Sequence, residues 1–197
     1  MHKTDTDDAI TSLHDLSATD LLAGYRAKQF SPSEVMEEVL AHVAVWEPHV
    51  HALYLCDPDG ARAVARASTE RWQKGELMGT LDGVPVTIKD NIATKGQPVP
   101  LGAASVRHVP AEKDAPPAAR LREAGAVIFS KTTMPDYGML SSGLSSFHPL
   151  TRNPWDLTKN PGGSSAGAGA AGAAGYGPLP PERMERIRGI LGEPLRV

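Results

Sequence analysis

Cysteine and aromatic residues are scarce in this chain, and neither sign of charge dominates it. The single cysteine, Cys56, excludes an internal disulfide framework and fits a reducing compartment, where we expect it to be a small buried apolar residue. Aromatic residues make up 5% of the sequence, which is too few for a base-stacking platform. A net charge of −3 and a pI near 6.2 favour neither nucleic acid nor an anionic membrane as a partner.

Long hydrophobic runs are also missing from the sequence. Residues 1–8 are polar and acidic with no apolar stretch behind them, so we expect neither a signal peptide nor a membrane anchor, and we expect a cytoplasmic protein. His42, His49 and His51 lie close in sequence, but one cysteine and no convincing acidic cluster nearby predict no metal site. No feature of the sequence calls for a cofactor.

The periodicity of the apolar residues predicts an α/β fold. With 41% hydrophobic residues, 197 residues are enough for one domain with its own core. Spacing near 3.6 predicts helices over residues 17–28, about 32–46, about 60–74 and about 116–123, the second opened by the capping box Ser31-Pro32-Ser33-Glu34. Short β-rich runs at 84–88 and 126–129 predict strands.

The most informative segment is 160–177, which is almost entirely Gly and Ala around Ser164 and Ser165. Such residues cannot fill a core by volume, but they allow the backbone to approach another segment or a ligand closely. A flexible linker is the alternative, and the Ala-rich part of the run instead favours a close-packed helix after the glycines. The segment therefore indicates a site with two hydroxyls at its entrance.

Lys89 is the second residue of chemical interest. It follows Ile88 at the end of the predicted strand 84–88, where desolvation would lower the pKa of its ammonium. A plain ion pair with Asp90 or a solvated strand end is the structural alternative. A lysine with two serines elsewhere in the chain is the set of groups used in Ser-Lys nucleophilic hydrolysis.

Several ordered motifs together resemble the amidase signature family, from about Leu16 to about Leu179. The family folds around a mixed sheet flanked by helices and hydrolyses carboxylic amides with a lysine, a serine in a cis peptide and a nucleophilic serine. The motifs that carry the resemblance are Gly83-Val84-Pro85-Val86-Thr87-Ile88-Lys89-Asp90, Leu121-Arg122-Glu123-Ala124-Gly125-Ala126-Val127-Ile128, Ser130-Lys131-Thr132, Asn153-Pro154-Trp155-Asp156 and Gly162-Gly163-Ser164-Ser165.

The resemblance implies roles for individual residues of this chain. Lys89 matches the base, and Ser164 matches the cis serine that relays a proton between the lysine and the nucleophile. Gly162 and Gly163 leave room for the cis bond, and Ser165 is expected to support the loop by hydrogen-bonding locally at the start of the Ala/Gly helix. Asn153 and Asp156 are expected to hold their loop through turn hydrogen bonds.

The resemblance also implies an incomplete site. The family places its nucleophilic serine and oxyanion-hole amides beyond the cis serine, whereas Arg188 stands at about that position here and no serine follows Ser165. We therefore expect residues 1–179 to be a partial amidase signature domain, with a helical part over 1–80 and an α/β part over 81–179. Residues 180–197 are expected to form a divergent tail containing a short helix over about 181–191.

Three functions follow as alternatives. The first is an amidase-family hydrolase of small-molecule carboxylic amides that, lacking its nucleophile, is inactive or nearly so alone. The second is a non-catalytic protein that self-associates or pairs with a full-length relative through uncovered core surface and edge strands. The third is a dinucleotide-binding module, because Gly167 to Gly172 match G-x-G-x-x-G, although no hydrophobic strand directly precedes that match.

Overall fold

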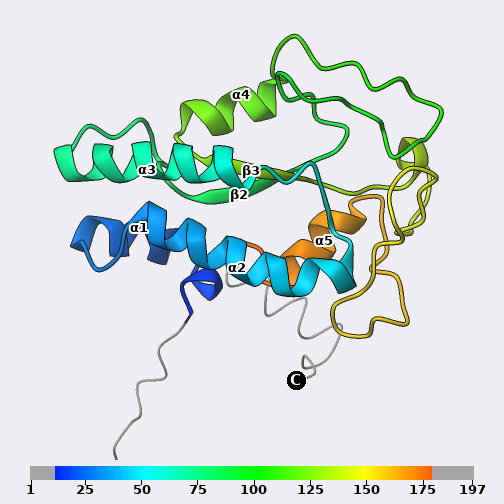
Figure 1. Ribbon diagram of the computed structural model, residues 1–197, viewed down its shortest axis with the longest axis horizontal. Helices are drawn as coiled ribbons and strands as arrows, with labels where there is room; N and C mark the ends of the chain where they lie inside the picture. The colour runs from blue at the N-terminus through cyan, green and yellow to red at the C-terminus, as the bar shows by residue number, and fades with distance from the viewer. Residues whose placement is uncertain (1–11, 179–197) are drawn as a thin grey trace, which may run out of the picture.

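The computed structural model describes residues 12–178, in which helices surround a small mixed sheet (Figure 1). Residues 1–11 and 179–197 lie outside the described residues, and with them the expected tail 180–197 and its helix. Within residues 12–178, no helix combines the length and apolarity needed to cross a bilayer. The elements in chain order are η1 (Leu13–Asp15), α1 (Ala18–Ala27), α2 (Pro32–Val50), β1 (Leu53–Tyr54), α3 (Pro58–Lys74), β2 (Pro85–Lys89), α4 (Pro116–Glu123), β3 (Val127–Thr132), η2 (Asp136–Gly138) and α5 (Ala166–Ala173).

The predicted helices and strands are present, with shifts at their ends. The capping box at Ser31 opens α2 as predicted, but the helix continues past residue 46 to Val50 with Pro48 inside it. A proline in the last turn removes one hydrogen bond, while the buried Val50 keeps this turn packed on the core. Asp57 caps α3 by accepting a hydrogen bond from the amide of Gly60, so that helix begins two residues before the expected Gly60.

The sheet has the order β1-β3-β2. β2 runs parallel to β3, and β1 runs antiparallel to it, which makes the sheet mixed as the resemblance implies. β1 was not predicted from the sequence, because a strand of two residues is too short to alternate. Cys56 was predicted to be buried, and this was wrong: it is exposed because it lies in the loop between β1 and α3.

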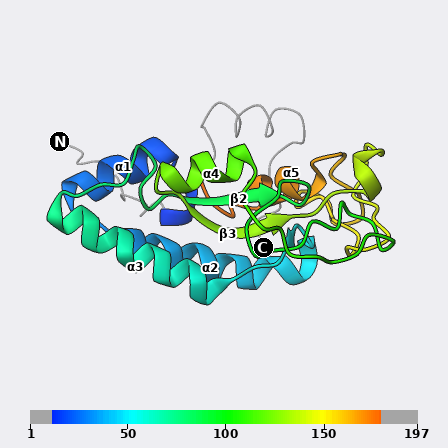
Figure 2. The same cartoon turned by 90° about the horizontal axis from the view of Figure 1, so that it is seen from above.

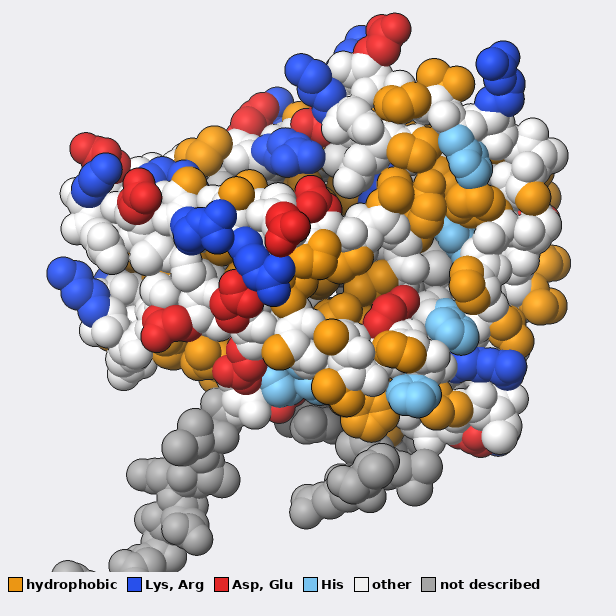
Figure 3. All heavy atoms as spheres, viewed as in Figure 1, with side chains coloured by type: hydrophobic (Ala, Val, Ile, Leu, Met, Phe, Trp, Pro, Cys, Tyr) orange, Lys and Arg blue, Asp and Glu red, His pale blue; other side chains and the backbone are white. Residues whose placement is uncertain are grey.

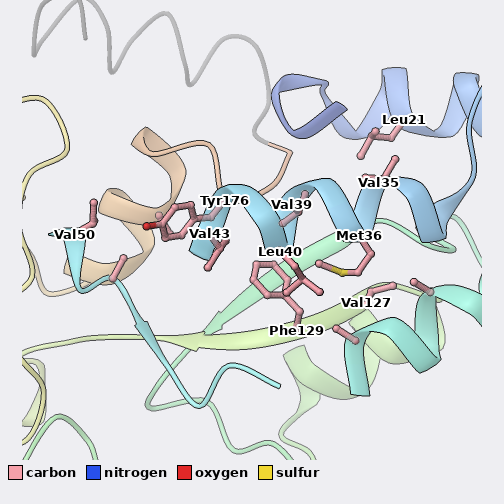
Figure 4. Close-up of a cluster of buried hydrophobic side chains, with 14 of the residues drawn as sticks. Leu21, Val35, Met36, Val39, Leu40, Val43, Val50, Val127, Phe129 and Tyr176 are labelled. Carbon is pink, nitrogen blue, oxygen red and sulfur yellow. The ribbon is translucent and has the colours of Figure 1, made fainter. Parts of the chain in front are cut away.

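The core forms where α2, α3 and α5 meet β3. Figure 4 shows Leu40 of α2 beside Phe129 of β3, and Val39, Val43 and Tyr176 belong to the same cluster. Figure 2 shows α2 and α3 side by side along the molecule, and Figure 1 places α4 on the other side of the sheet from α2. Because residues from the N-terminal helices and from α5 share this core, its burial ties both ends of the described chain to the sheet.

A buried ion pair holds the turn that leads into β2. The carboxylate of Asp82 accepts hydrogen bonds from Nε of Arg71 at 2.8 Å, the hydroxyl of Ser68 at 2.7 Å and the amide of Met78 at 2.8 Å. Burial alone would raise the pKa of Asp82, but these hydrogen bonds together outweigh burial and lower it. The charged form of Asp82 is therefore stabilised where β2 begins.

α5 touches the end of β3 through Gly167. A Cβ atom built on Gly167 would lie 2.3 Å from the carbonyl oxygen of Ala52 and 2.3 Å from the amide nitrogen of Thr133. The amide of Gly167 also donates a hydrogen bond of 3.0 Å to the carbonyl of Thr133. Gly169, further along the same helix, has open space where its Cβ would lie. The close backbone approach expected of the glycine-rich run is thus found at Gly167.

We expect Gly167→Ala and Gly169→Ala to change stability in opposite directions. At Gly167 the added methyl meets backbone atoms that cannot swing away, so the free energy of unfolding should fall by roughly 2 kcal/mol. At Gly169 the methyl enters open space and improves helix propensity, which should raise the free energy of unfolding by about 0.5–1 kcal/mol. Urea unfolding of both variants measures this, and equal shifts would contradict the account of α5 packing.

Candidate active site

The site forms where β2 ends and α5 begins. Lys89 is the last residue of β2, and its Nζ lies 3.0 Å from Oγ of Ser164 and 3.0 Å from Oγ of Ser165. The three side chains come from segments about 75 residues apart in sequence, which the parallel pairing of β2 with β3 and the contact of α5 with both strands bring together. Lys89 does not pair with Asp90 through a hydrogen bond, so the plain ion-pair interpretation of this lysine is not supported.

The loop that carries the two serines has an unusual backbone. The Gly163–Ser164 peptide bond is cis, as the resemblance implies, and Gly162 has a φ of +82°, a conformation that favours glycine. A Cβ on Gly163 would lie 2.6 Å from the amide nitrogen of Ser142, so this loop passes directly over the 140–142 segment. The amide of Gly162 donates to Oδ1 of Asn160 at 2.9 Å, which fixes the approach to the cis bond.

Ser165 departs from its expected role. It is the residue that precedes α5 in the cap position, yet its side chain makes no capping hydrogen bond. Its hydroxyl instead lies against the ammonium of Lys89. The expectation of a local hydrogen bond at the helix start was therefore wrong, because Lys89 offers a charged donor at 3.0 Å and a charge-assisted bond is stronger than a neutral one.

The surroundings of Lys89 lower the pKa of its ammonium. Desolvation at the half-buried end of β2 is the larger effect, and the negative charge of Asp90 opposes it. A lowered pKa increases the fraction of neutral amine near neutral pH, and a neutral amine can accept a proton. The lowered pKa of Lys89 agrees with the prediction from its position at the end of an apolar strand.

Asp90 and His148 form a buried pair beside Lys89. Nε2–H of His148 donates to Oδ2 of Asp90 at 2.9 Å, and the same oxygen accepts the amide of Gly102 at 2.7 Å. The side chains of both Asp90 and His148 are almost fully buried. The pair joins the end of β2 to the loops around residues 102 and 148. It therefore fixes the position of the Asp90 carboxylate, whose negative charge opposes the effect of desolvation on the pKa of Lys89.

A second lysine, Lys131 of β3, is almost fully buried. The ammonium of Lys131 donates to the carbonyl of Ile92 at 2.9 Å, and burial lowers the pKa of this ammonium while Asp90 opposes that effect. The sequence analysis placed Lys131 only in a family motif and assigned no contact to His148. The sequence shows only that Lys131 lies just after a predicted strand and His148 in a loop. Neither position reveals which distant residue the side chain contacts.

Two loops, over residues 91–115 and 133–165, surround the site at one end of the molecule (Figure 1). Asn153 and Asp156 hold the second loop as predicted: Oδ1 of Asn153 accepts the amide of Trp155, and Oδ1 of Asp156 accepts the amide of Thr158. Hydrophobic side chains are exposed on the loop end, whereas charged side chains dominate the face over α3 (Figure 3). The exposed apolar residues of the loops are Val109, Tyr137, Met139, Leu140, Leu144 and Leu157.

The structure weighs against a dinucleotide site. Gly167, Gly169 and Gly172 all lie inside α5, and no strand directly precedes that helix. A dinucleotide fingerprint requires the glycines at the turn between a strand and a helix, where the backbone can approach a pyrophosphate. Here the first of these glycines instead packs against the backbone of Ala52 and Thr133.

Comparison with known proteins supports one family. A family model described as Amidase matches residues 34–180. One subunit of the glutamyl-tRNA(Gln) amidotransferase from Chloroflexus aurantiacus is 40% identical over 169 residues, and its counterpart from Acidothermus cellulolyticus is 41% identical over 163 residues. The first match covers 86% of this chain and 35% of the relative, and the second covers 83% and 32%. The chain thus spans about a third of the length of these relatives.

Solved structures with a similar fold also include amidases. A bacterial aryl acylamidase of the amidase signature enzymes has a TM-score of 0.78 and 31% identity, covering 85% of this chain and 35% of that one. The native peptide amidase from Stenotrophomonas maltophilia has a TM-score of 0.76 and 29% identity, covering 82% of this chain and 34% of that one. The fold described here is therefore shared with the corresponding third of these enzymes.

We expect the Nζ of Lys89 to titrate below the ordinary lysine pKa of about 10.4. Asp90→Asn should lower this pKa further, because it removes the negative charge that favours the ammonium. Asp59→Asn, which changes a carboxylate exposed on α3, is the matched control and should leave the Lys89 titration unchanged. NMR titration of the lysine Nζ signals measures all three proteins. A pKa at or above the ordinary value, or no response to Asp90→Asn, would contradict this electrostatic account.

Proposed function

The chain belongs to the amidase family, and we propose that it forms the proton-transfer part of an amide hydrolase site. In this proposal Lys89 is the base and Ser164 is the relay. The observation that carries it is the contact of 3.0 Å between Nζ of Lys89 and Oγ of Ser164, a serine that follows a cis peptide bond. Gly162 and Gly163 precede this serine, and the hydroxyl of Ser165 lies at the same distance of 3.0 Å from Nζ of Lys89.

The arrangement supports a short proton path. When Lys89 is neutral, its Nζ accepts the hydroxyl proton of Ser164, and Ser164 in turn takes a proton from a nucleophile on its other side. The lowered pKa of Lys89 favours the neutral amine that this step needs. When the amide bond breaks, the proton moves back along the same path to the leaving nitrogen of the amide.

We propose that these residues alone do not turn over amides. No serine follows Ser165 in the sequence, so an acyl-enzyme on a third serine is not formed by these residues. Each missing oxyanion donor removes a contribution of roughly 10²–10³ in rate. Turnover then requires a nucleophile and oxyanion amides from residues other than those present here.

The proposed substrates are small molecules with a carboxylic amide. The names of matched relatives, a peptide amidase and an aryl acylamidase, support this class, and they do not narrow the acyl group for this chain. The exposed apolar loop residues around the site favour a substrate with an apolar part. We place the protein in the cytoplasm because its single cysteine, Cys56, fits a reducing compartment.

Association with a full-length member of the family is the second candidate function. The outer edge of β2 pairs with no strand within residues 12–178, and a groove of about 250 Å³ runs between this edge and α5. Val86, Ala171 and Tyr176 contribute apolar surface to the groove. An unpaired edge beside apolar surface favours pairing with another chain.

The purified chain should release no ammonia above background from simple primary amides such as acetamide and benzamide. Lys89→Ala should give the same background, because these residues are proposed not to turn over amides whether or not the base is present. Size-exclusion chromatography, alone and with the aryl acylamidase, tests the second candidate on the same samples: a larger joint species supports association, and independent elution opposes it.

Ammonia release that is lost in Lys89→Ala would contradict the proposed lack of turnover. It would mean that Ser164 or Ser165 serves as the nucleophile in this chain. Lys113→Ala, which removes an exposed lysine from the loop before α4, is the matched control for loss of a positive charge.

A further inference from the structure

Lys89 contacts two hydroxyls rather than one, and the proposed proton relay uses only Ser164. The distances from its Nζ to the two Oγ atoms are both 3.0 Å. The two serines differ in access, since Ser164 is half-buried and Ser165 is exposed. A Cβ on Gly138 would lie 3.6 Å from Oγ of Ser164, so the backbone of the η2 loop lies close to that hydroxyl.

Ser165 has the environment of an activated nucleophile. Its hydroxyl makes no capping bond, so it is not committed to the backbone of α5. Its partner is a lysine with a lowered pKa, which can act as the base. Ser165 also precedes α5, whose N-terminal dipole favours negative charge developing on its oxygen.

We propose that Ser165 is an acyl-accepting nucleophile whose base is Lys89 and whose substrates are small activated carboxylic esters. This goes beyond the proposed amide hydrolysis and rests on the proposed base role of Lys89. The reaction is a stoichiometric acylation of the chain, because an aryl ester loses a stable phenolate whereas an amide must lose a protonated nitrogen.

The step is an ordinary acyl transfer. Neutral Nζ of Lys89 accepts the hydroxyl proton of Ser165, and Oγ of Ser165 forms a bond to the carbonyl carbon of the ester. The bond between that carbon and the aryl oxygen breaks, and its electron pair leaves with the phenolate. The proton held by Lys89 then passes to solvent, which leaves Ser165 as an ester.

The test uses p-nitrophenyl acetate and peptide mapping by mass spectrometry. The Cys56→Ser chain is the starting protein, because the exposed thiol of Cys56 is itself acylated by such esters. We expect an acetyl group on Ser165 and a matching burst of p-nitrophenolate. Ser141, an exposed serine of the same 133–165 loop, is the internal control and should carry no acetyl group in the same map.

Two variants test the roles of the residues. Lys89→Met keeps the length and apolar stem of the side chain, and it should lower the rate of Ser165 labelling by roughly 10²-fold or more. Ser141→Ala should leave that rate unchanged. Circular dichroism of each variant checks that the fold is kept, and the label position in the Cys56→Ser chain tests the proposal even if Lys89→Met does not fold.

Several outcomes would overturn the inference. They are an acetyl group on the amine of Lys89 or on Ser164 in place of Ser165, labelling of Ser141 as fast as Ser165, and unchanged labelling of Ser165 in a folded Lys89→Met chain. An unlabelled Ser165 together with a Lys89 that titrates below the ordinary pKa overturns this inference and leaves the proposed function standing. A Lys89 that keeps its ordinary pKa overturns both.

Discussion

The contact between the ammonium of Lys89 and the two serine hydroxyls is the interaction on which the site depends. It joins the end of β2, which carries Lys89, to the start of α5, which follows the two serines. The lysine is fixed by a strand that is hydrogen-bonded to β3, and the serines are fixed by a loop whose glycines pass close to other backbone. Lys89 and the two serines come from different segments, so their contact exists only in the folded chain.

Packing explains why the segment that carries the two serines is rich in glycine. Gly167 brings α5 against the ends of β1 and β3, and Gly163 brings the serine loop against residue 142. A larger residue at either place would push the serines away from β2. The low side-chain volume of the run therefore serves positioning, while Ala170 and Ala171 of α5 still contribute to the shared core.

Much of this architecture could be predicted from the sequence, because its signals are local. Each signal involves residues that are close in sequence. The signals are the capping box of α2, the helical spacing of α1 and α3, and the β-rich runs of β2 and β3. The family motifs also identified Lys89 and Ser164 as partners. The contacts that were missed connect distant segments: the pairing of β1 with β3, the bond from His148 to Asp90, and the burial of Lys131. Ser165 was misjudged because a serine before a helix is usually a local cap.

We propose that residues 12–178 supply a competent lysine and relay serine to an amidase site. A chimera in which these residues replace the matched third of the aryl acylamidase, with arylamine release as the readout, measures whether they do. The account predicts that the folded chimera releases arylamine and that Lys89→Ala and Ser164→Ala each lower the rate by roughly 10²-fold or more. A folded chimera that is inactive, or that keeps its rate without Lys89, would contradict the account.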